Sequence, residues 1–336
     1  MNKTNPRITS HVIQLDMSDL SQDNGGLHSM LWGFTAIMCF SILLNSAIIM
    51  ACFLRNFDKP LLLFITLCSL TDTAWAIVGV SYYLATVLAP KRNISFVQCL
   101  VEMFFLYFTI IQQFLNIWLM YIDRHLAIFW PYTYVAQIAN KRGALKLAAV
   151  VWTLGLILSI SHPAVTTLMI FCKPVVVIQD VTCIFGPVAR SACGNYKIPI
   201  IVTAFVFYSV CGLTGMTAMY STWKIIRKCR KSTTEVNQKA LHTCLTQLFV
   251  TLTNFLSMLF ISVFKRFVHH PMASVTLDLT GMVLPATIDP LIFGLRIQEI
   301  RTTFSNLYHR LEFKLFHKGF SSRNRELTKG NITTIL

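Results

Sequence analysis

The sequence predicts an all-α integral membrane protein, built as a bundle of seven transmembrane helices. Three observations support this fold class. Of the 336 residues, 54% are apolar and only 13% are charged; seven apolar runs are each long enough to cross a bilayer; and lysine and arginine residues flank these runs. Because a helix needs roughly 20 apolar residues to cross about 30 Å of hydrocarbon, each run is expected to form one span.

The seven runs follow one another with short connections. Their approximate bounds are 30–54, 61–88, 99–122, 144–170, 198–223, 245–264 and 275–295. The longest connections are too short to hold an independent soluble core. We therefore expect one membrane domain over residues 30–295, preceded by an N-terminal segment of residues 1–29 and followed by a tail of residues 296–336.

The distribution of basic residues predicts the orientation. With the N-terminus outside, the inner segments carry two, four, six and eight lysine and arginine residues in chain order, and nine of the 29 remain outside. The positive-inside rule therefore predicts an extracellular N-terminus and a cytoplasmic C-terminus. The net charge of +15 needs no nucleic-acid partner, because the basic groups flank apolar spans and form no single face. Asn2, in the sequon Asn2-Lys3-Thr4, is a glycosylation candidate on the outer side.

Ten cysteines divide by compartment. Six lie in spans or at the inner face, and four are expected on the oxidising outer side: Cys99, Cys172, Cys183 and Cys193. Four cysteines allow three pairings. A Cys99–Cys183 bridge would hold the middle of the second outer loop over the bundle, and Cys172–Cys193 would then close that loop on itself. We expect this pairing, with free thiols as the alternative.

Ionisable residues inside hydrocarbon are costly, so each one is a candidate functional residue. Asp72 lies midway along the second run, and Asp289 lies in the seventh, directly before Pro290. The two acids could share a proton or a cation, or be bridged through water to Asn45 and Asn116. A purely structural network of polar contacts would need the same residues.

The segment MYIDRHLAIFWPYTY, residues 120–134, places charge where the third run meets the inner surface. Arg124 can pair with Asp123 in one state and turn toward a cytoplasmic partner in another, which is the geometry of a switch. A plain positive-inside anchor would need the arginine but gives no reason for the preceding acid.

The same segment resembles the MAYDRYVAICxPLxY motif of odorant receptors, a branch of the class A G-protein-coupled receptors. KALHTC at residues 239–244 is similar to their KAFSTC motif, and PATIDPLIFGLRIQEIR at residues 285–301 is similar to their PPxLNPIIYxxRxxEIR ending. The ending is most similar to the branch found in aquatic vertebrates. The resemblance extends from the first span to a short amphipathic cytoplasmic helix expected after Arg296. Phe293 departs from the motif, which has tyrosine there, and Gln113 stands where odorant receptors often carry glutamate.

The resemblance implies a ligand pocket in the outer half of the bundle. Counting helical positions from Cys99 and Arg124 gives the inward face of the third helix, and the sixth helix is expected to supply the opposite part of the wall. The expected lining residues are Leu106, Tyr107, Ile110, Ile111, Phe255, Met258, Leu259 and Ser262. Such a wall suits mostly apolar molecules.

The implied function is an odorant receptor in the plasma membrane of olfactory sensory neuron cilia. It would bind a small-molecule odorant and activate a heterotrimeric G protein of the stimulatory type, which raises cyclic AMP, with Asp123, Arg124 and Phe293 at the switch. The expected partners are the odorant, the G protein and membrane lipid. The alternatives are a non-olfactory class A receptor and a seven-span transporter. We expect neither an enzyme, since no catalytic motif is present, nor a cofactor or metal site, apart from a sodium ion that Asp72 and Asp289 could share.

Overall fold

The protein is described from a computed structural model. It covers residues 12–16, 26–57, 59–89, 91–178, 180–194, 196–231, 235–268, 271–297 and 300–306. Seven of its helices are long and apolar enough to cross a membrane, which confirms the predicted seven-helix bundle. These helices are α2 (Gly26–Leu54), α3 (Pro60–Leu88), α4 (Phe96–Phe129), α6 (Lys141–Thr167), α8 (Lys197–Lys231), α9 (Glu235–Ser262) and α10 (Pro271–Arg296).

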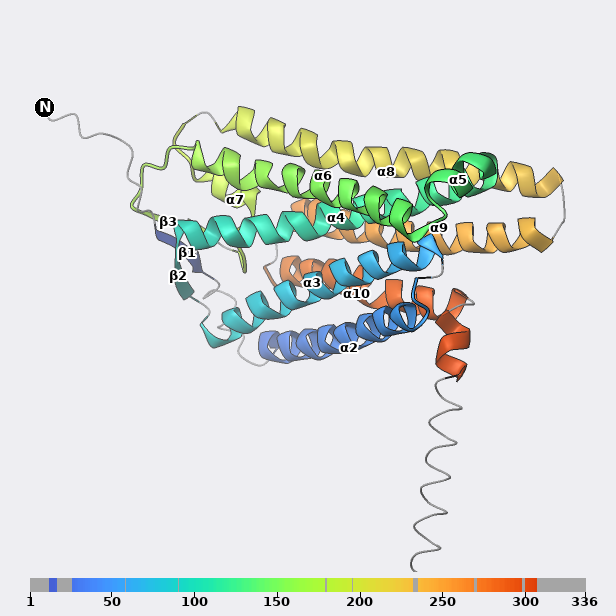
Figure 1. Ribbon diagram of the computed structural model, residues 1–336. Helices are drawn as coiled ribbons and strands as arrows, with labels where there is room; N and C mark the ends of the chain where they lie inside the picture. Colours follow the sequence, from blue (N-terminus) through green and yellow to red (C-terminus); the bar gives the residue numbers. More distant parts are fainter. Residues whose placement is uncertain are drawn as a thin grey trace, which may run out of the picture.

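The long helices run roughly side by side, and α4 lies at the centre of the bundle (Figure 1). Helix α4 contacts α3, α6, α8 and α9, while α10 closes the bundle against α2, α3 and α9. Large apolar side chains remain exposed on the outside, for example Leu43 at 68%, Val150 at 67% and Phe205 at 74%. A soluble protein would cover such side chains, whereas lipid tails solvate them.

Local sequence explains where several helices begin. Pro60 occupies the first turn of α3, where its missing N–H costs no helical hydrogen bond. The side chain of Ser95 caps α4 by accepting a hydrogen bond from the backbone N–H of Gln98, and Asn140 caps α6 in the same way from Gly143. Two shorter helices, α5 (Pro131–Gln137) and α7 (Phe185–Arg190), and the 3-10 helix η1 (Phe264–Phe267) lie in the connections.

One end of the bundle carries a small β-sheet that the sequence did not predict (Figure 1). Strand β1 (Val12–Asp16) lies between β2 (Lys91–Ser95), to which it is antiparallel, and β3 (Val175–Ile178), to which it is parallel. Ile13 and Leu15 of β1 are buried on a cluster that includes Met103 and Val188. We call this end the sheet end, and the opposite end, where Arg124 and residues 300–306 lie, the tail end.

The tail end includes a short helical segment. Residues 300–306 are helical and lie shortly after α10 in the sequence. Arg55, at the end of α2, donates hydrogen bonds to the hydroxyls of Thr302 and Thr303, and Ile300 is buried. The rest of the expected tail, residues 307–336, and the sequon at Asn2 lie outside the described residues.

Candidate ligand cavity, polar core and tail-end switch

A cavity of about 840 Å³ lies at the sheet end, enclosed by α3, α4, α6, α8, α9 and α10 and roofed by residues 180–190. Cavities of about 300–1,000 Å³ hold small organic ligands. Much of the wall is apolar, with Leu106, Ile110, Phe207, Met258 and Met282 among its members. The cavity therefore has the size and character of a site for a small, mostly apolar molecule.

The cavity wall also carries polar groups, which come from several of its elements. Thr203 of α8 and Ser262 of α9 offer hydroxyl groups, and Asp180 of the roof and Asp278 of α10 offer carboxylates. Asp180 accepts a hydrogen bond from the backbone N–H of Val181 at 2.7 Å, which fixes its place in the roof. These groups can orient a ligand whose body lies against the apolar wall.

The cavity includes five of the eight residues expected to line a pocket. Leu106, Tyr107, Ile110, Met258 and Ser262 are on its wall. The other three are not among its described lining residues. Ile111 is fully buried in the core, Phe255 packs edge-on against Phe114 with ring centroids 5.2 Å apart, and Leu259 is 43% exposed on the outside of α9.

His162 lines the cavity, although the sequence did not identify it as a lining residue. Its ring stacks on the ring of Tyr107, with centroids 3.6 Å apart and an interplanar angle of 15°. The side chain of His162 is buried and lies on α6, one of the elements of the cavity wall from which no lining residue was expected. The stack joins α4 to α6 at the cavity and gives this part of the wall a fixed aromatic surface.

Two disulfide bonds hold the roof. Cys99, in the first turn of α4, is bonded to Cys183 in the roof, and Cys172 is bonded to Cys193. Both pairs are those that the sequence led us to expect. The first bond joins positions 84 residues apart and fixes residues 180–190 against α4; the second closes the segment that contains β3 and α7.

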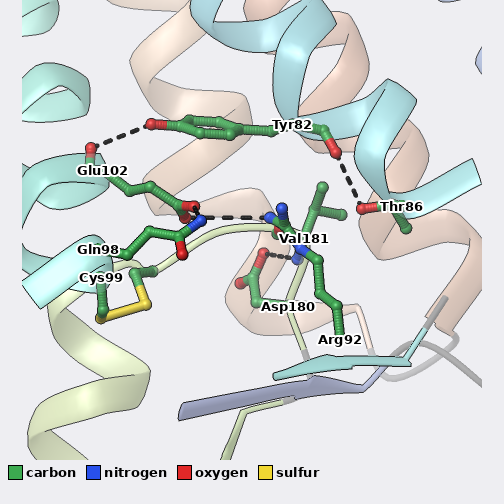
Figure 2. Close-up of polar contacts among 9 residues, drawn as sticks. Tyr82, Thr86, Arg92, Gln98, Cys99, Glu102, Asp180 and Val181 are labelled. Carbon is green, nitrogen blue, oxygen red and sulfur yellow. Dashed lines mark hydrogen bonds and ion pairs between the residues drawn. A yellow bond between two sulfur atoms is a disulfide. The ribbon is translucent and has the colours of Figure 1, made fainter. Parts of the chain in front are cut away.

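A polar cluster beside the Cys99–Cys183 bond adds a second attachment (Figure 2). Arg92 of β2 donates a hydrogen bond to the backbone carbonyl of Val181 at 3.0 Å. Its guanidinium also lies 3.9 Å from the carboxylate of Glu102 on α4, and Gln98 donates to the other oxygen of that carboxylate at 3.4 Å. The side chains of Arg92 and Glu102 are only 16% and 9% exposed, so this pair is largely withdrawn from solvent.

A buried polar network lies below the cavity, nearer the tail end. Asp72 of α3 and Asp289 of α10 are bridged by the side-chain amide of Gln113 on α4, whose nitrogen lies 2.9 Å from Asp72 Oδ1 and 3.3 Å from Asp289 Oδ2. Asn254 of α9 also donates to Asp289 Oδ2, at 2.8 Å. The sequence singles out the two acids and marks Gln113 as a departure from the family, but it does not identify Gln113 or Asn254 as their hydrogen-bond partners.

Asn45 belongs to the same buried polar region, but it donates its hydrogen bond to a backbone carbonyl and not to either acid. Pro290 has no N–H, so the carbonyl of Ala286, four residues earlier in α10, lacks its usual helical partner. Asn45 donates to this carbonyl at 3.0 Å, and the hydroxyl of Ser41 donates to it as well. Helix α2 therefore supplies the hydrogen bonds that the proline removes, and all of these groups are buried.

Asn116 joins three helices. Its amide nitrogen donates to the carbonyl of Leu67 on α3 at 3.1 Å, and its oxygen accepts hydrogen bonds from Trp152 of α6 and Gln112 of α4. Gly155 allows α6 to approach at this point, because a Cβ there would meet the side-chain oxygen of Gln112 at 2.0 Å. The four residues of the expected polar network are thus all buried, but Asn45 and Asn116 bond to carbonyls and amides rather than to the two acids.

At the tail end, the carboxylate of Asp123 interacts with two neighbouring side chains. Arg124 Nε lies 3.8 Å from one carboxylate oxygen, and the Tyr134 hydroxyl of α5 donates to the other at 3.0 Å. Burial, together with the charge of Asp123, raises the pKa of Tyr134 above its usual range, so the phenol stays protonated and able to donate. Asp123 is 1% exposed and Arg124 is 22% exposed, so the arginine side chain remains partly accessible.

Phe293, the third expected switch residue, is 1% exposed and belongs to the core cluster that also contains Tyr121 and Ile297. The hydroxyl of Tyr121 shares a 3.0 Å hydrogen bond with Thr251 of α9. Gln247 of α9 donates to the carbonyl of Met120 at 3.4 Å. These contacts join α4 to α9 next to Arg124, and Phe293 contributes apolar packing without a hydroxyl group.

Among the described residues, no group of three or more histidine, cysteine, aspartate or glutamate side chains is arranged to hold a metal ion.

Comparison with known proteins identifies the family. A family model described as olfactory receptor matches residues 34–310. Human olfactory receptor 4N5 is 28% identical over 252 residues, which are 74% of this chain and 79% of that receptor. Human olfactory receptor 52N4 is 26% identical over 247 residues, covering 72% and 76% of the two chains, and mouse olfactory receptor 4E2 is 26% identical over 285 residues, covering 82% and 89%. The chain belongs to the olfactory receptor family of class A G-protein-coupled receptors, which are multi-pass plasma-membrane proteins and not enzymes.

Proposed function

We propose that this receptor binds a small odorant in the cavity at the sheet end and, in response, activates a stimulatory G protein that raises cyclic AMP. The observation that carries the proposal is the cavity itself. Its volume of about 840 Å³, its largely apolar wall and its roof fixed by Cys99–Cys183 match what a small-molecule site requires.

The proposed orientation places the N-terminus and the sheet end outside the cell. Both disulfide bonds are at the sheet end, and disulfides persist in the oxidising extracellular environment. The inner ends of the helices carry the surplus of lysine and arginine, for example Lys224, Arg227 and Lys228 of α8, as the positive-inside rule requires. In this orientation, ligands enter from outside and Arg124 faces the cytoplasm. The location in cilia of olfactory sensory neurons is part of the same proposal.

The ligand that fits best is mostly apolar with a polar group at one end. Leu106, Ile110 and Met258 offer apolar contacts, while Ser262 and Thr203 offer hydroxyl groups. Burial of apolar surface supplies most of the binding free energy, and a few hydrogen bonds select the orientation. The Tyr107–His162 stack provides an aromatic surface against which an alkyl or aromatic ligand can lie.

For activation, we propose that ligand binding favours a state in which the tail end of α9 moves away from α4. The contacts that would have to break are Tyr121–Thr251 and Gln247–Met120. Their loss would open a space beside Arg124 into which a segment of the G protein could insert. The ligand must bind this open state more tightly than the resting state, since a ligand with equal affinity for both shifts nothing.

A sodium ion shared by Asp72 and Asp289 does not fit the donor set of this site. Between the two carboxylates lies the side-chain nitrogen of Gln113, which donates to both. Sodium requires oxygen ligands, and an N–H group pointing at the same carboxylate oxygens repels a cation. We therefore derive no step of the mechanism through sodium.

The proposed function is tested in cells that display the surface-tagged chain. Cyclic AMP is measured while a panel of amphiphilic odorants is applied, with untransfected cells as the control. A rise that is specific to the transfected cells supports the proposal. If cyclic AMP does not rise although surface display is confirmed, and the odorants instead elicit a response through another class of G protein, the stimulatory coupling is contradicted. The assignment of the ligand to the cavity is then tested separately, by measuring whether the odorant raises the thermal midpoint of the receptor.

A further inference from the structure

We propose that the side-chain amide of Gln113 takes the place of a bound cation between Asp72 and Asp289, so that the resting bundle of this receptor does not respond to sodium. The inference concerns the ligand-free protein and does not depend on the odorant or on the G protein.

The orientation of the amide follows from its partners. The hydroxyl of Thr71 bonds to the amide oxygen of Gln113, which leaves the NH₂ group on the side of the two carboxylates. This group has two hydrogens, and it lies within hydrogen-bond distance of one oxygen of each acid, Asp72 Oδ1 at 2.9 Å and Asp289 Oδ2 at 3.3 Å. One amide group therefore provides one donor for each carboxylate.

Burial makes this bridge energetically important. Asp72 is 2% exposed, Asp289 is 0% exposed and Gln113 is 7% exposed. Two carboxylates brought together away from water need donors or positive charge between them. The amide supplies donors, and Asn254 adds a second donor to Asp289 Oδ2 at 2.8 Å, so the oxygens nearest the bridge are already bonded to nitrogen.

The bridge differs from an ion because it cannot dissociate. Gln113 is part of α4, Asp72 of α3, Asp289 of α10 and Asn254 of α9, so four helices are tied together by side chains alone. A bridging sodium ion would make the stability of this joint depend on sodium concentration by mass action. The amide removes that dependence.

The second oxygen of each carboxylate, Asp72 Oδ2 and Asp289 Oδ1, accepts no hydrogen bond from the described residues. An ion that bypassed the amide would have to bind at these two oxygens. The experiment therefore measures the sodium response of the native protein directly.

The ligand-free receptor is purified, and its thermal unfolding midpoint is compared in sodium, potassium and choline chloride at equal ionic strength. We expect the three midpoints to agree within experimental error. A midpoint that is higher in sodium than in both other salts would overturn the proposal, whether or not the receptor responds to any odorant.

Two variants separate the amide from a general structural role. Gln113→Glu puts a carboxylate oxygen where the amide nitrogen stands, and we expect it to gain a sodium-specific rise in the midpoint; equal midpoints in all three salts for this variant would contradict the assignment to the amide. Gln112→Met is the matched control. It removes a buried amide one position away, which bonds to Asn116 and not to the acids, so we expect a lower midpoint with no sodium response.

Discussion

The guanidinium of Arg92 lies 3.9 Å from the carboxylate of Glu102 and donates to the carbonyl of Val181. One side chain thus connects the strand β2, the helix α4 and the roof of the cavity, beside the Cys99–Cys183 bond (Figure 2). The roof is held by a covalent bond and by a hydrogen bond from Arg92, whose ion pair with Glu102 is mostly shielded from water.

Glu102→Gln should lower the thermal midpoint of the ligand-free receptor, because it leaves the Arg92 charge without its partner. Breaking a fully buried pair costs about 3–5 kcal/mol, and the partial exposure of Arg92 makes the expected loss smaller. Lys91→Gln is the control. It removes an ion pair with Asp16 in which the lysine side chain is 60% exposed. Exposed ion pairs of this kind stabilise a protein by about 1 kcal/mol or less. Equal shifts for the two variants would argue against a special role of the Arg92–Glu102 pair.

Replacing Cys183 by serine should abolish or greatly reduce surface display, since the roof loses its bond to α4. The bond closes a segment of 84 residues, and losing a disulfide of this kind costs roughly 2–5 kcal/mol. Surface display is measured by labelling an N-terminal tag on intact cells. Cys39→Ser, which changes a free and exposed cysteine, should leave display unchanged. Normal display of the Cys183 variant would show that the roof is not held by this bond.

Ser41→Ala should destabilise the receptor by about 0.5–1.5 kcal/mol, the usual net contribution of one hydrogen bond, because the Ala286 carbonyl keeps its hydrogen bond from Asn45. The hydroxyl of Ser41 is fully buried and donates to the Ala286 carbonyl that Pro290 leaves without a helical partner. Ser46→Ala is a close control, because the Ser46 hydroxyl is exposed and bonds only within its own helix. If both variants melt at the native temperature, the hydrogen bond from Ser41 to the Ala286 carbonyl does not stabilise the receptor.

Ile110→Phe should reduce the cavity volume and select against large odorants. We expect the concentration for half-maximal cyclic AMP response to rise at least about tenfold for the largest agonists, which corresponds to roughly 1.4 kcal/mol, with a smaller effect on small agonists. Leu259→Ala is the control, since Leu259 is exposed on the outer face of α9. An equal loss for agonists of all sizes in the Ile110 variant, or a similar loss in the Leu259 variant, would place the ligand elsewhere.

The sequence predicted the seven spans well because their signal is local. A run of apolar residues is visible without knowledge of its neighbours, and its length is set by the bilayer. The sheet at the sheet end depends on pairing between distant segments. Strand β1 has five residues, β2 reads KRNIS and β3 has four residues, and none of these carries a strong strand signal on its own.

A count of helical positions predicted the residues that line the pocket with only partial accuracy. Each residue turns the helix by about 100°, so an error of one position moves a side chain from the cavity to the lipid. Met258 and Ser262 face the cavity, whereas Leu259, one position after Met258, is 43% exposed. His162 was passed over because α6 gave no sign in the sequence that it reaches the cavity, and the amide of Gln113 could be placed between the two acids only once three helices were positioned around it.

The proposed mechanism requires that a ligand in the cavity act through Arg124 on a G protein. The most direct test compares the native receptor with Arg124→Ala in two assays: the cyclic AMP response to an agonist, and the rise in thermal midpoint that the same agonist causes. We predict that the variant loses the cyclic AMP response and keeps the ligand-induced stabilisation, while Arg142→Ala, which changes an exposed arginine at the start of α6, keeps both. An undiminished cyclic AMP response in the Arg124 variant would contradict this mechanism.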